Sequence, residues 1–352
     1  MILFKIFKRI LFYSYLVAQV NWLKFFKLRS KNAENVLLMF QTYPNDYFAY
    51  LSSGTVENDF ALLNALLEHN QPFELCLGIK NLLKYKSKKI YFNISYFFNI
   101  EKKENYAESL LLFLSDLEKQ GNALIPRKSD AAYWENKEYM QQQFQNLNIP
   151  HPKTWIVSKA EQLPSEQILD FPVLYKPFHS SGSVGIVEVK DYASLLETIE
   201  KEGRYGFFLQ KRVNMTRDIR VIFVGDEIVL HYWRINNSKE WKPTSTGHGS
   251  SVDFDFFPEQ WRDFIHQEYK KLNLKTGAFD ITWENDDFDT TPLFLEVSPS
   301  YMPNPPQPKE YASLTYKAYK NKLFGKQAYY KSYIDLVFVI KKKLVTAYIT
   351  QK

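Results

Sequence analysis

The segment that decides the fold spans residues 174–189 and reads LYKPFHSSGSVGIVEV. An apolar run ends at Lys176 and Pro177, a loop of small residues follows, and a second apolar run then begins. The small residues of this loop are Ser180, Ser181, Gly182, Ser183 and Gly185. Because glycine permits positive φ and small side chains allow close approach, such a loop can turn several backbone N–H groups toward an anion. With Lys176 at its root, the segment is either a phosphate-binding loop or an ordinary hairpin turn.

Length and composition indicate a large globular chain. Its 352 residues, of which 45% are hydrophobic, are enough for two or three subdomains. The single cysteine, Cys76, excludes an intramolecular disulfide and a cysteine-rich metal site, and it is consistent with a reducing compartment.

The net charge of +6 is unevenly distributed, because the two ends are basic and the middle is acidic. Residues 10–23 (ILFYSYLVAQVNWL) are mostly apolar and have basic neighbours on both sides. This segment is too short and too polar to span a bilayer, which needs about 20 apolar residues, and no small-residue cleavage pattern follows it. It fits a helix that lies on an anionic membrane surface or one that packs on the protein's own body.

The first part of the chain alternates expected strands with expected helices. Short apolar runs predict strands at residues 36–40, 73–77, 90–94 and 123–125. Apolar residues at three- and four-residue spacing predict helices around residues 60–67 and 104–119. This alternation predicts a small α/β domain with a mostly parallel sheet. The turn after the first strand lacks the GxGxxG pattern, so a dinucleotide site is not expected there.

The middle of the chain predicts two further units. Asp130 is expected to cap a helix that contains Tyr133, Met140 and Phe144 and ends before residues 149–152 (IPHP), a linker. A four-stranded unit with a helix over 192–201 is expected from apolar runs at 154–157, 172–176, 186–189 and 207–210. A larger unit follows, with a hairpin at 219–225 and 228–235, a helix at 258–272, and strands at 277–283 and 293–297.

Two carboxylates lie on the last two expected strands. Asp280 and Glu296 each stand between apolar neighbours, so the alternation of a strand turns both away from the core. If these strands are adjacent, the two acids can converge on Mg²⁺, which proteins bind with one or two carboxylates plus substrate phosphates. A solvated strand face is the alternative.

Several motifs follow one another in a characteristic order between residues 130 and 306. They are Asn136-Lys137, NIPHPKT, Lys176-Pro177 with its loop, Leu209-Gln210, RDIRVIFVGDEIV, Arg234, STGHG, GAFDITW and LEVSPS. Together they resemble the ATP-grasp superfamily, and in particular carboxylate–amine ligases such as ribosomal-protein glutamate ligases and glutathione synthetase. The resemblance implies an α/β (α+β) ATP-grasp fold with an N-terminal Rossmann-like domain. The expected parts are a basic aromatic segment (1–35), an N-terminal α/β domain (36–129), a linker helix and small subdomain (130–210), a large subdomain with the metal site (211–310) and a basic tail (311–352).

The resemblance also implies roles for residues. Lys137 and Lys176 would contact the α- and β-phosphates of ATP, and the loop with Ser180, Ser181, Gly182, Ser183 and Gly185 would close over them. The segment whose backbone pairs with adenine would consist of Gln210, Lys211, Arg212 and Val213. Asp218 would lie near the ribose, Arg220, Arg234 and Lys176 would act on the reacting groups, and Asp280, Glu296 and Ser298 would bind Mg²⁺. The family usually has asparagine where this chain has Ser298, which puts a second metal ion in doubt.

The implied function is an ATP- and Mg²⁺-dependent ligase that joins a carboxylate to an amine through an acylphosphate. Its substrates would be small molecules, peptides or glycans, and a cell-envelope role at the cytoplasmic face of the membrane is one interpretation. A weakened ATP-grasp protein that only binds nucleotide or a membrane surface is the alternative. Zinc motifs, a GxSxG motif and nucleic-acid-binding modules are absent from the sequence. The loop with Ser245 and Gly249 is either a further phosphate site or a plain loop.

Overall fold

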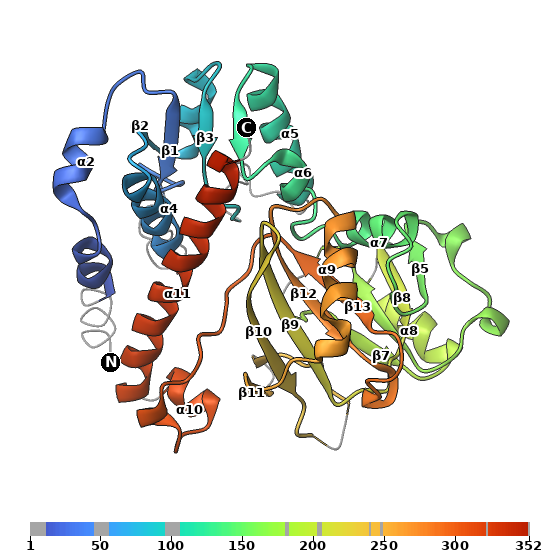
Figure 1. The fold of residues 1–352 in the computed structure, drawn as a ribbon. Coiled ribbons are helices and arrows are strands. Elements are labelled where there is room, and N and C mark those ends of the chain that lie inside the picture. Colours follow the sequence, from blue (N-terminus) through green and yellow to red (C-terminus); the bar gives the residue numbers. More distant parts are fainter. Residues whose placement is uncertain are drawn as a thin grey trace. The chain divides into compact units, whose positions relative to one another are not determined.

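The computed structural model describes residues 12–45, 56–95, 106–179, 183–202, 206–238, 241–246, 249–321 and 323–350. The chain divides into two compact units. The N-terminal unit consists of Met1–Ala131 and Ser300–Lys352, and the central unit consists of Ala132–Pro299. Figure 1 gives the elements of each unit along the chain.

The N-terminal unit is built on a four-stranded parallel sheet with the strand order β2-β1-β3-β4. The strands are β1 (Asn35–Met39), β2 (Phe73–Leu77), β3 (Lys89–Tyr91) and β4 (Ala123–Ile125). Helix α4 (Val56–Glu68) connects β1 to β2, and α5 (Tyr106–Lys119) precedes β4. The structure therefore confirms the predicted parallel α/β arrangement, in which apolar runs are buried by helices.

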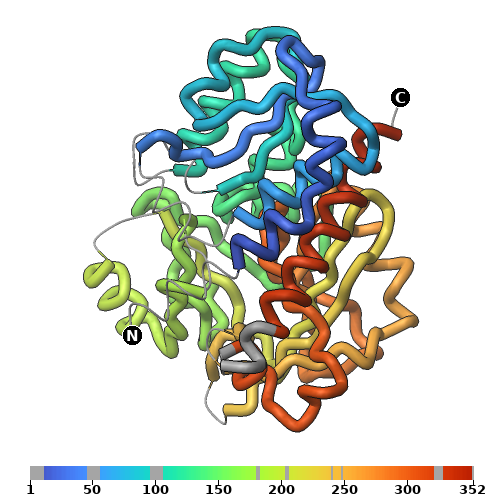
Figure 2. The backbone as a smooth tube through the Cα atoms, turned by 90° about the vertical axis from the view of Figure 1, so that its left-hand side faces the viewer, coloured from blue at the N-terminus to red at the C-terminus, as the bar shows by residue number. Residues whose placement is uncertain are grey.

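The C-terminal segment belongs to the N-terminal unit and is not a separate basic tail. It forms α10 (Tyr316–Asn321) and α11 (Leu323–Thr350), and α11 lies along α4 (Figures 1 and 2). Among the side chains of α11 that the structure describes, those buried are Tyr329, Tyr333, Ile334, Val337, Ile340, Leu344 and Val345. Their three- and four-residue spacing marks one apolar helix face, which the neighbouring lysines obscure in the sequence.

The N-terminal segment packs partly on the same core. Residues 12–18 are helical, Leu16 and Val20 are buried, and helix α2 (Trp22–Leu28) buries Phe25. Residues 10 and 11 of the apolar segment lie outside the described residues. Among the described residues, no helix is long and apolar enough to cross a membrane.

The first part of the central unit contains the predicted four-stranded sheet, which is antiparallel with the order β5-β8-β6-β7. Its strands are β5 (Thr154–Val157), β6 (Val173–Pro177), β7 (Val187–Val189) and β8 (Phe207–Lys211), and α8 (Tyr192–Glu202) lies in the connection from β7 to β8. Asp191 caps α8, because its carboxylate accepts a hydrogen bond from the Ser194 backbone N–H at 2.8 Å.

The predicted start of the preceding helix was wrong. Helix α7 spans Lys137–Asn146, and its cap is Asn136, whose side chain accepts from the Tyr139 N–H at 3.2 Å. Asp130 belongs instead to a short helix, α6 (Lys128–Ala131), where Arg127 binds its carboxylate. Glu135 interrupts the helical path between them with φ of 51°.

The second part of the central unit is a five-stranded sheet with the order β11-β10-β9-β12-β13. The strands are β9 (Arg217–Val224), β10 (Glu227–Ile235), β11 (Ser251–Asp253), β12 (Thr276–Thr282) and β13 (Leu293–Ser298), and helix α9 spans Arg262–Lys271. The predicted hairpin and the predicted last strand pair are both present.

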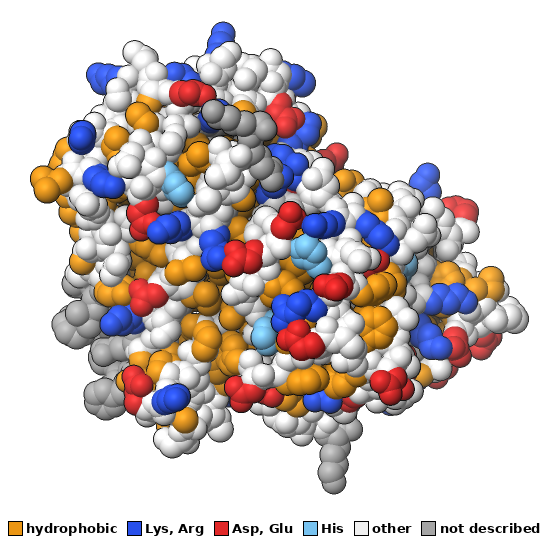
Figure 3. Space-filling model, viewed as in Figure 1, with side chains coloured by type: hydrophobic (Ala, Val, Ile, Leu, Met, Phe, Trp, Pro, Cys, Tyr) orange, Lys and Arg blue, Asp and Glu red, His pale blue; other side chains and the backbone are white. Residues whose placement is uncertain are grey.

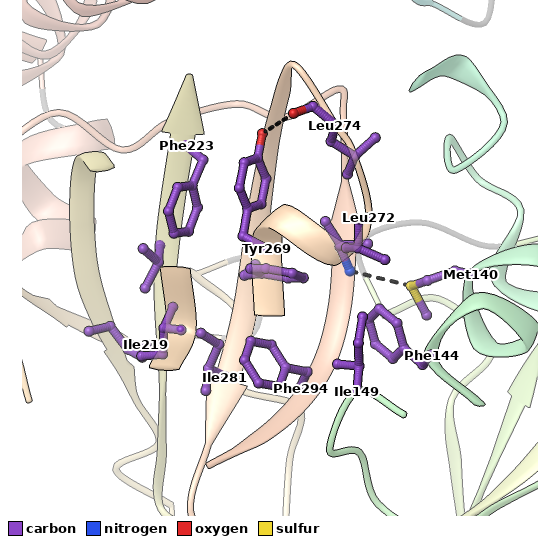
Figure 4. Close-up of a cluster of buried hydrophobic side chains, with 14 of the residues drawn as sticks. Met140, Phe144, Ile149, Ile219, Phe223, Tyr269, Leu272, Leu274, Ile281 and Phe294 are labelled. Atoms are coloured by element: carbon purple, nitrogen blue, oxygen red, sulfur yellow. Dashed lines mark hydrogen bonds between the residues drawn. The ribbon is translucent and has the colours of Figure 1, made fainter. Parts of the chain in front are cut away.

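One face of this sheet is an aromatic core. Figure 4 shows Phe223, Ile281 and Phe294 on the strands against Tyr269 of α9, and Met140 and Phe144 of α7 beside them. The rings of Phe223 and Tyr269 stack with centroids 4.0 Å apart. Because successive side chains of a strand point to opposite faces, the polar residues between these core residues must point to the other face, called here the polar face.

Candidate active site

The polar face carries a row of four polar side chains that crosses the strands. Tyr232 on β10 is opposite Arg220 on β9, Arg220 is opposite Asp280 on β12, and Asp280 is opposite Glu296 on β13. Residues directly opposite one another in adjacent strands project from the same face. The two strands are adjacent, which is the condition under which Asp280 and Glu296 can converge on a cation.

Two arginines and two aspartates on this face form a continuous charge chain. Arg220 donates to both Asp280 oxygens, from Nε at 2.7 Å and from Nη2 at 2.8 Å. Arg234 donates through Nη2 to Asp280 at 2.8 Å, and it also binds both oxygens of Asp218. Side-chain exposure is 22% for Arg220 and below 10% for the other three. Burial opposes ionisation of Asp280, but the two guanidinium groups outweigh it and lower the pKa of Asp280 to about 2.

Glu296 differs from Asp280 in its surroundings. Its side chain is 42% exposed, and Lys137 Nζ lies 3.6 Å from its Oε1. Ser298 stands two residues further along β13, opposite Ala278, and so on the same face as Glu296. The structure contains, within its described ranges, no cluster of three or more His, Cys, Asp or Glu side chains placed for a metal ion.

These contacts decide how well the predicted metal ligands fit Mg²⁺. Both oxygens of Asp280 already accept bonds from arginines, and two guanidinium groups therefore offset its charge before any cation binds. Glu296 presents an accessible carboxylate, and one carboxylate together with substrate phosphates is sufficient for Mg²⁺. The geometry thus favours Glu296, while the roles of Asp280 and Ser298 as ligands stay predictions.

Two lysines accompany this carboxylate. Lys137 is the first residue of α7, and its side chain is 9% exposed. Lys176 on β6 is half-buried, and its Nζ donates to Gln210 Oε1 at 2.5 Å. Burial lowers the pKa of Lys176 to about 8, and the nearby Glu296 acts in the opposite direction. The two ammonium groups and Glu296 therefore interact electrostatically.

The predicted adenine-binding segment, residues 210–213, begins at Gln210 near the end of β8. The Gln210 amide bridges two strands, since it accepts from Lys176 and donates to Thr154 Oγ1 at 3.0 Å. The side chains of Lys211 and Arg212 form ion pairs with Asp170 (3.0 Å) and Glu188 (2.7 Å). Their backbone N–H groups donate to the carbonyls of Lys153 and Pro172. An adenine would therefore have to use other backbone groups of this segment, such as those at the buried Val213.

Part of the small-residue loop is described. Ser180, Ser181 and Gly182 lie outside the described residues, as do Gly247 and His248 of the later loop. Ser183 and Gly185 have φ of 65° and 74°, and the loop joins the antiparallel pair β6 and β7. A Cβ on Gly185 would lie 3.0 Å from Pro177 Cγ, so glycine is required there for both conformation and space.

The chain is similar to known proteins in part of its sequence and in its fold. No protein-family model matches the chain. Over 167 residues it is 27% identical to alpha-aminoadipate–LysW ligase LysX of Saccharolobus solfataricus, which covers 45% of this chain and 57% of that protein. The chain thus matches little more than half the length of this relative.

Solved structures agree over most of the chain. A RimK-domain ATP-grasp protein of Sphaerobacter thermophilus superposes with a TM-score of 0.52 and 11% identity, covering 88% of this chain and 99% of that one. This chain has the ATP-grasp fold. D-alanine–D-alanine ligase of Bacillus anthracis in complex with ATP superposes with a TM-score of 0.54 and 14% identity, covering 91% and 99%. The ATP-grasp fold confirms the resemblance and the mixed α/β class predicted from the motif order.

Two residues of this candidate site were missed in the sequence. Among the described residues, the buried Tyr232 hydroxyl opposite Arg220 has no hydrogen-bond partner. Thr244 is buried, and its side chain lowers the pKa of Asp218. The alternation of β10 could have indicated Tyr232, because Arg234 lies two residues later on the same face. Thr244 lies in a loop, where no periodic signal exists.

Proposed function

We propose that this ATP-grasp chain is an ATP- and Mg²⁺-dependent ligase that joins a carboxylate to an amine through an acylphosphate intermediate. The observation that carries the proposal is the convergence of Lys137, Lys176 and Glu296 beside the Arg220–Asp280 pair, all within the central unit. The matched relative is itself named as a ligase. The fold supports the proposal less strongly than the site geometry does, because one fold can carry different activities.

The lysines fit the phosphates of a nucleotide. Lys176 is half-buried beside a neutral amide and an aromatic ring, with its Nζ 5.8 Å from the centre of Phe208. Removal of water from the ammonium group lowers the pKa of Lys176. A phosphate group would add counter-charge to that of Glu296, and Lys137 could contribute the second cation.

The proposed reaction needs positioned charges more than acids and bases. Transfer of a phosphoryl group depends on in-line positioning and on cations around the migrating group. Mg²⁺, when bound, would neutralise phosphate charge, and Glu296 would hold it. Arg220 uses two of its five N–H donors on Asp280. Its remaining donors can orient the carboxylate substrate, while Asp280 and Arg234 keep Arg220 in place.

Nucleotide binding should weaken at alkaline pH. The pKa of Lys176 is lowered to about 8, so the free protein loses this charge as the pH rises from about 7 to about 9. Bound phosphate would favour the ammonium form, and binding above that pKa must therefore take up a proton, which lowers the affinity for ATP. Calorimetric titrations with ATP across this range measure the decline.

The variant Lys176→Arg is the control for this pH dependence. A guanidinium group keeps its charge throughout this range, so the slope of affinity against pH should flatten even if the affinity itself changes. An equal slope in Lys176→Arg and in the native protein would show that Lys176 does not govern the pH dependence.

The activity is tested by ADP release. The purified protein is incubated with Mg-ATP and with mixtures of amino acids, hydroxy acids, short peptides and amino sugars, and ADP is measured with the acid or the amine left out. We expect ADP release only when both an acid and an amine are present, with loss in Lys176→Met. Release that is independent of both substrates would contradict a ligase.

A second candidate function is nucleotide binding without turnover. Two observations favour it, namely the engagement of Asp280 by Arg220 and Arg234 and the presence of Ser298 where the family has asparagine. Tight Mg-ATP binding without ADP formation across all mixtures would support this alternative over the ligase.

The class of substrate and the location of the protein in the cell are also proposed. We propose that the acid and the amine belong to small molecules, peptides or glycans and that nucleic acid is not a partner. A role in modifying envelope glycan or peptide at the cytoplasmic face of the membrane is supported by the basic, aromatic N-terminal segment, whose structure leads to the following inference.

A further inference from the structure

Helix α2 has one face packed on the protein and one apolar face exposed. Phe25 is 7% exposed and packs against Phe73 of β2, with ring centroids 5.7 Å apart. Leu23 and Phe26 are 87% and 71% exposed. Because residues three apart on a helix are neighbours, Leu23 and Phe26 form one outward apolar surface. Single exposed hydrophobic residues are common on proteins, but adjacent ones indicate an interaction site.

Trp22 extends this surface and is held in place. Its ring centroid lies 5.3 Å from that of Phe25 and 6.4 Å from that of Phe26. Its indole N–H donates to the Val17 carbonyl at 3.1 Å, and the side chain is 40% exposed. The exposed surface of α2, defined here as Trp22, Leu23 and Phe26, is therefore an ordered aromatic ledge.

Basic side chains follow the aromatic ledge. Lys27, Arg29 and Lys31 are exposed, and Arg29 lies 5.9 Å from the Phe25 ring centre. Residues 12–33 contain four basic residues and no acidic residue. In Figure 3 hydrophobic and basic side chains lie next to one another at the left margin, where Figure 1 places α2.

We propose that the aromatic ledge of α2 docks this protein on an anionic lipid bilayer. Tryptophan, phenylalanine and leucine fit the boundary between headgroups and acyl chains, and lysine and arginine beside them fit lipid phosphates and other anionic headgroups. The proposed contact is with the bilayer surface, and among the described residues no helix can span a bilayer. The proposal does not depend on ligase activity.

The test is sedimentation of the full chain with vesicles. Phosphatidylcholine vesicles with and without phosphatidylserine are used at low and high salt. The native protein should bind the anionic vesicles about tenfold more tightly than the neutral ones, and added salt should weaken the binding. The double variant Leu23→Ser and Phe26→Ser should lose most of this binding, as should Lys27→Glu combined with Arg29→Glu.

The matched control is Leu112→Ser, because Leu112 is 62% exposed on α5 of the same unit and lies far from α2 in the sequence. It should leave vesicle binding unchanged. The proposal is overturned if the native protein does not sediment with anionic vesicles, if the α2 variants bind as well as the native protein, or if Leu112→Ser has an equal effect. Self-association that is lost in the α2 variants, without vesicle binding, would instead assign the ledge to a protein contact.

Discussion

Replacing Lys176 with methionine should weaken binding of Mg-ATP by about thirtyfold or more. Loss of one partner from a buried charge pair costs about 2 kcal/mol or more, which corresponds to that factor. Methionine preserves the apolar stem and removes a half-buried ammonium group whose pKa is already lowered to about 8. The fold should therefore survive. Calorimetry with Mg-ATP measures the loss.

The control for this variant is Lys153→Met. Lys153 is an exposed lysine of the same small sheet region, and its ammonium group lies 4.9 Å from the Trp155 ring. We expect its affinity for Mg-ATP to stay within about twofold of the native value, since exposed charges contribute little. Equal affinities for Lys176→Met and the native protein would mean that the nucleotide site lies elsewhere.

Replacing Arg234 with alanine should have the largest effect on stability. Arg234 binds Asp218 and Asp280, and the three side chains are each less than 10% exposed. Removal of one member of a buried ion network leaves uncompensated charge and typically costs about 3 to 5 kcal/mol. Urea unfolding at neutral pH should show this decrease in the free energy of unfolding.

The control variant is Arg262→Ala, which shows whether the loss of stability is specific to the buried Arg234. Arg262 pairs with Glu259 at 2.6 Å, but their side chains are 42% and 67% exposed. Such a surface pair contributes about 1 kcal/mol or less. Similar losses in Arg234→Ala and Arg262→Ala would contradict the importance of the buried charge chain.

The sheets could be predicted from the sequence because their apolar runs are buried. Residues 279–281 and 295–297 each place an acid between apolar neighbours, and the alternation correctly turned Asp280 and Glu296 away from the core. The motif order then identified the ATP-grasp fold, which the superpositions confirm.

The contacts of the site could not be predicted in the same way. The pairing of β12 with β13 shifts between Asp280 and Ile281, so that Leu295 is an extra residue on β13. Such bulges change which side chains meet, and no local pattern marks them. The binding of Asp280 by Arg220 and Arg234 depends on the register of β10, β9 and β12. Because Asp280 is bound in this way, Glu296 is the better candidate for the metal.

The predictions of a helix start at Asp130 and of a separate C-terminal tail were wrong. Asp130 and Asn136 are both good capping residues, and the choice between them depended on the positive φ of Glu135. The lysines of α11 hid an apolar face that packs on α4. In both cases tertiary packing decided what local composition left open.

The most direct measurement is a crystal structure with Mg²⁺ and a non-hydrolysable ATP analogue. We expect phosphate oxygens within hydrogen-bond distance of Lys137 and Lys176, Mg²⁺ on Glu296, and adenine beside residues 210–213. The unfilled volume next to the γ-phosphate would then show the size and charge of the acid and the amine. An analogue bound away from Lys137, Lys176 and Glu296 would contradict the proposed site.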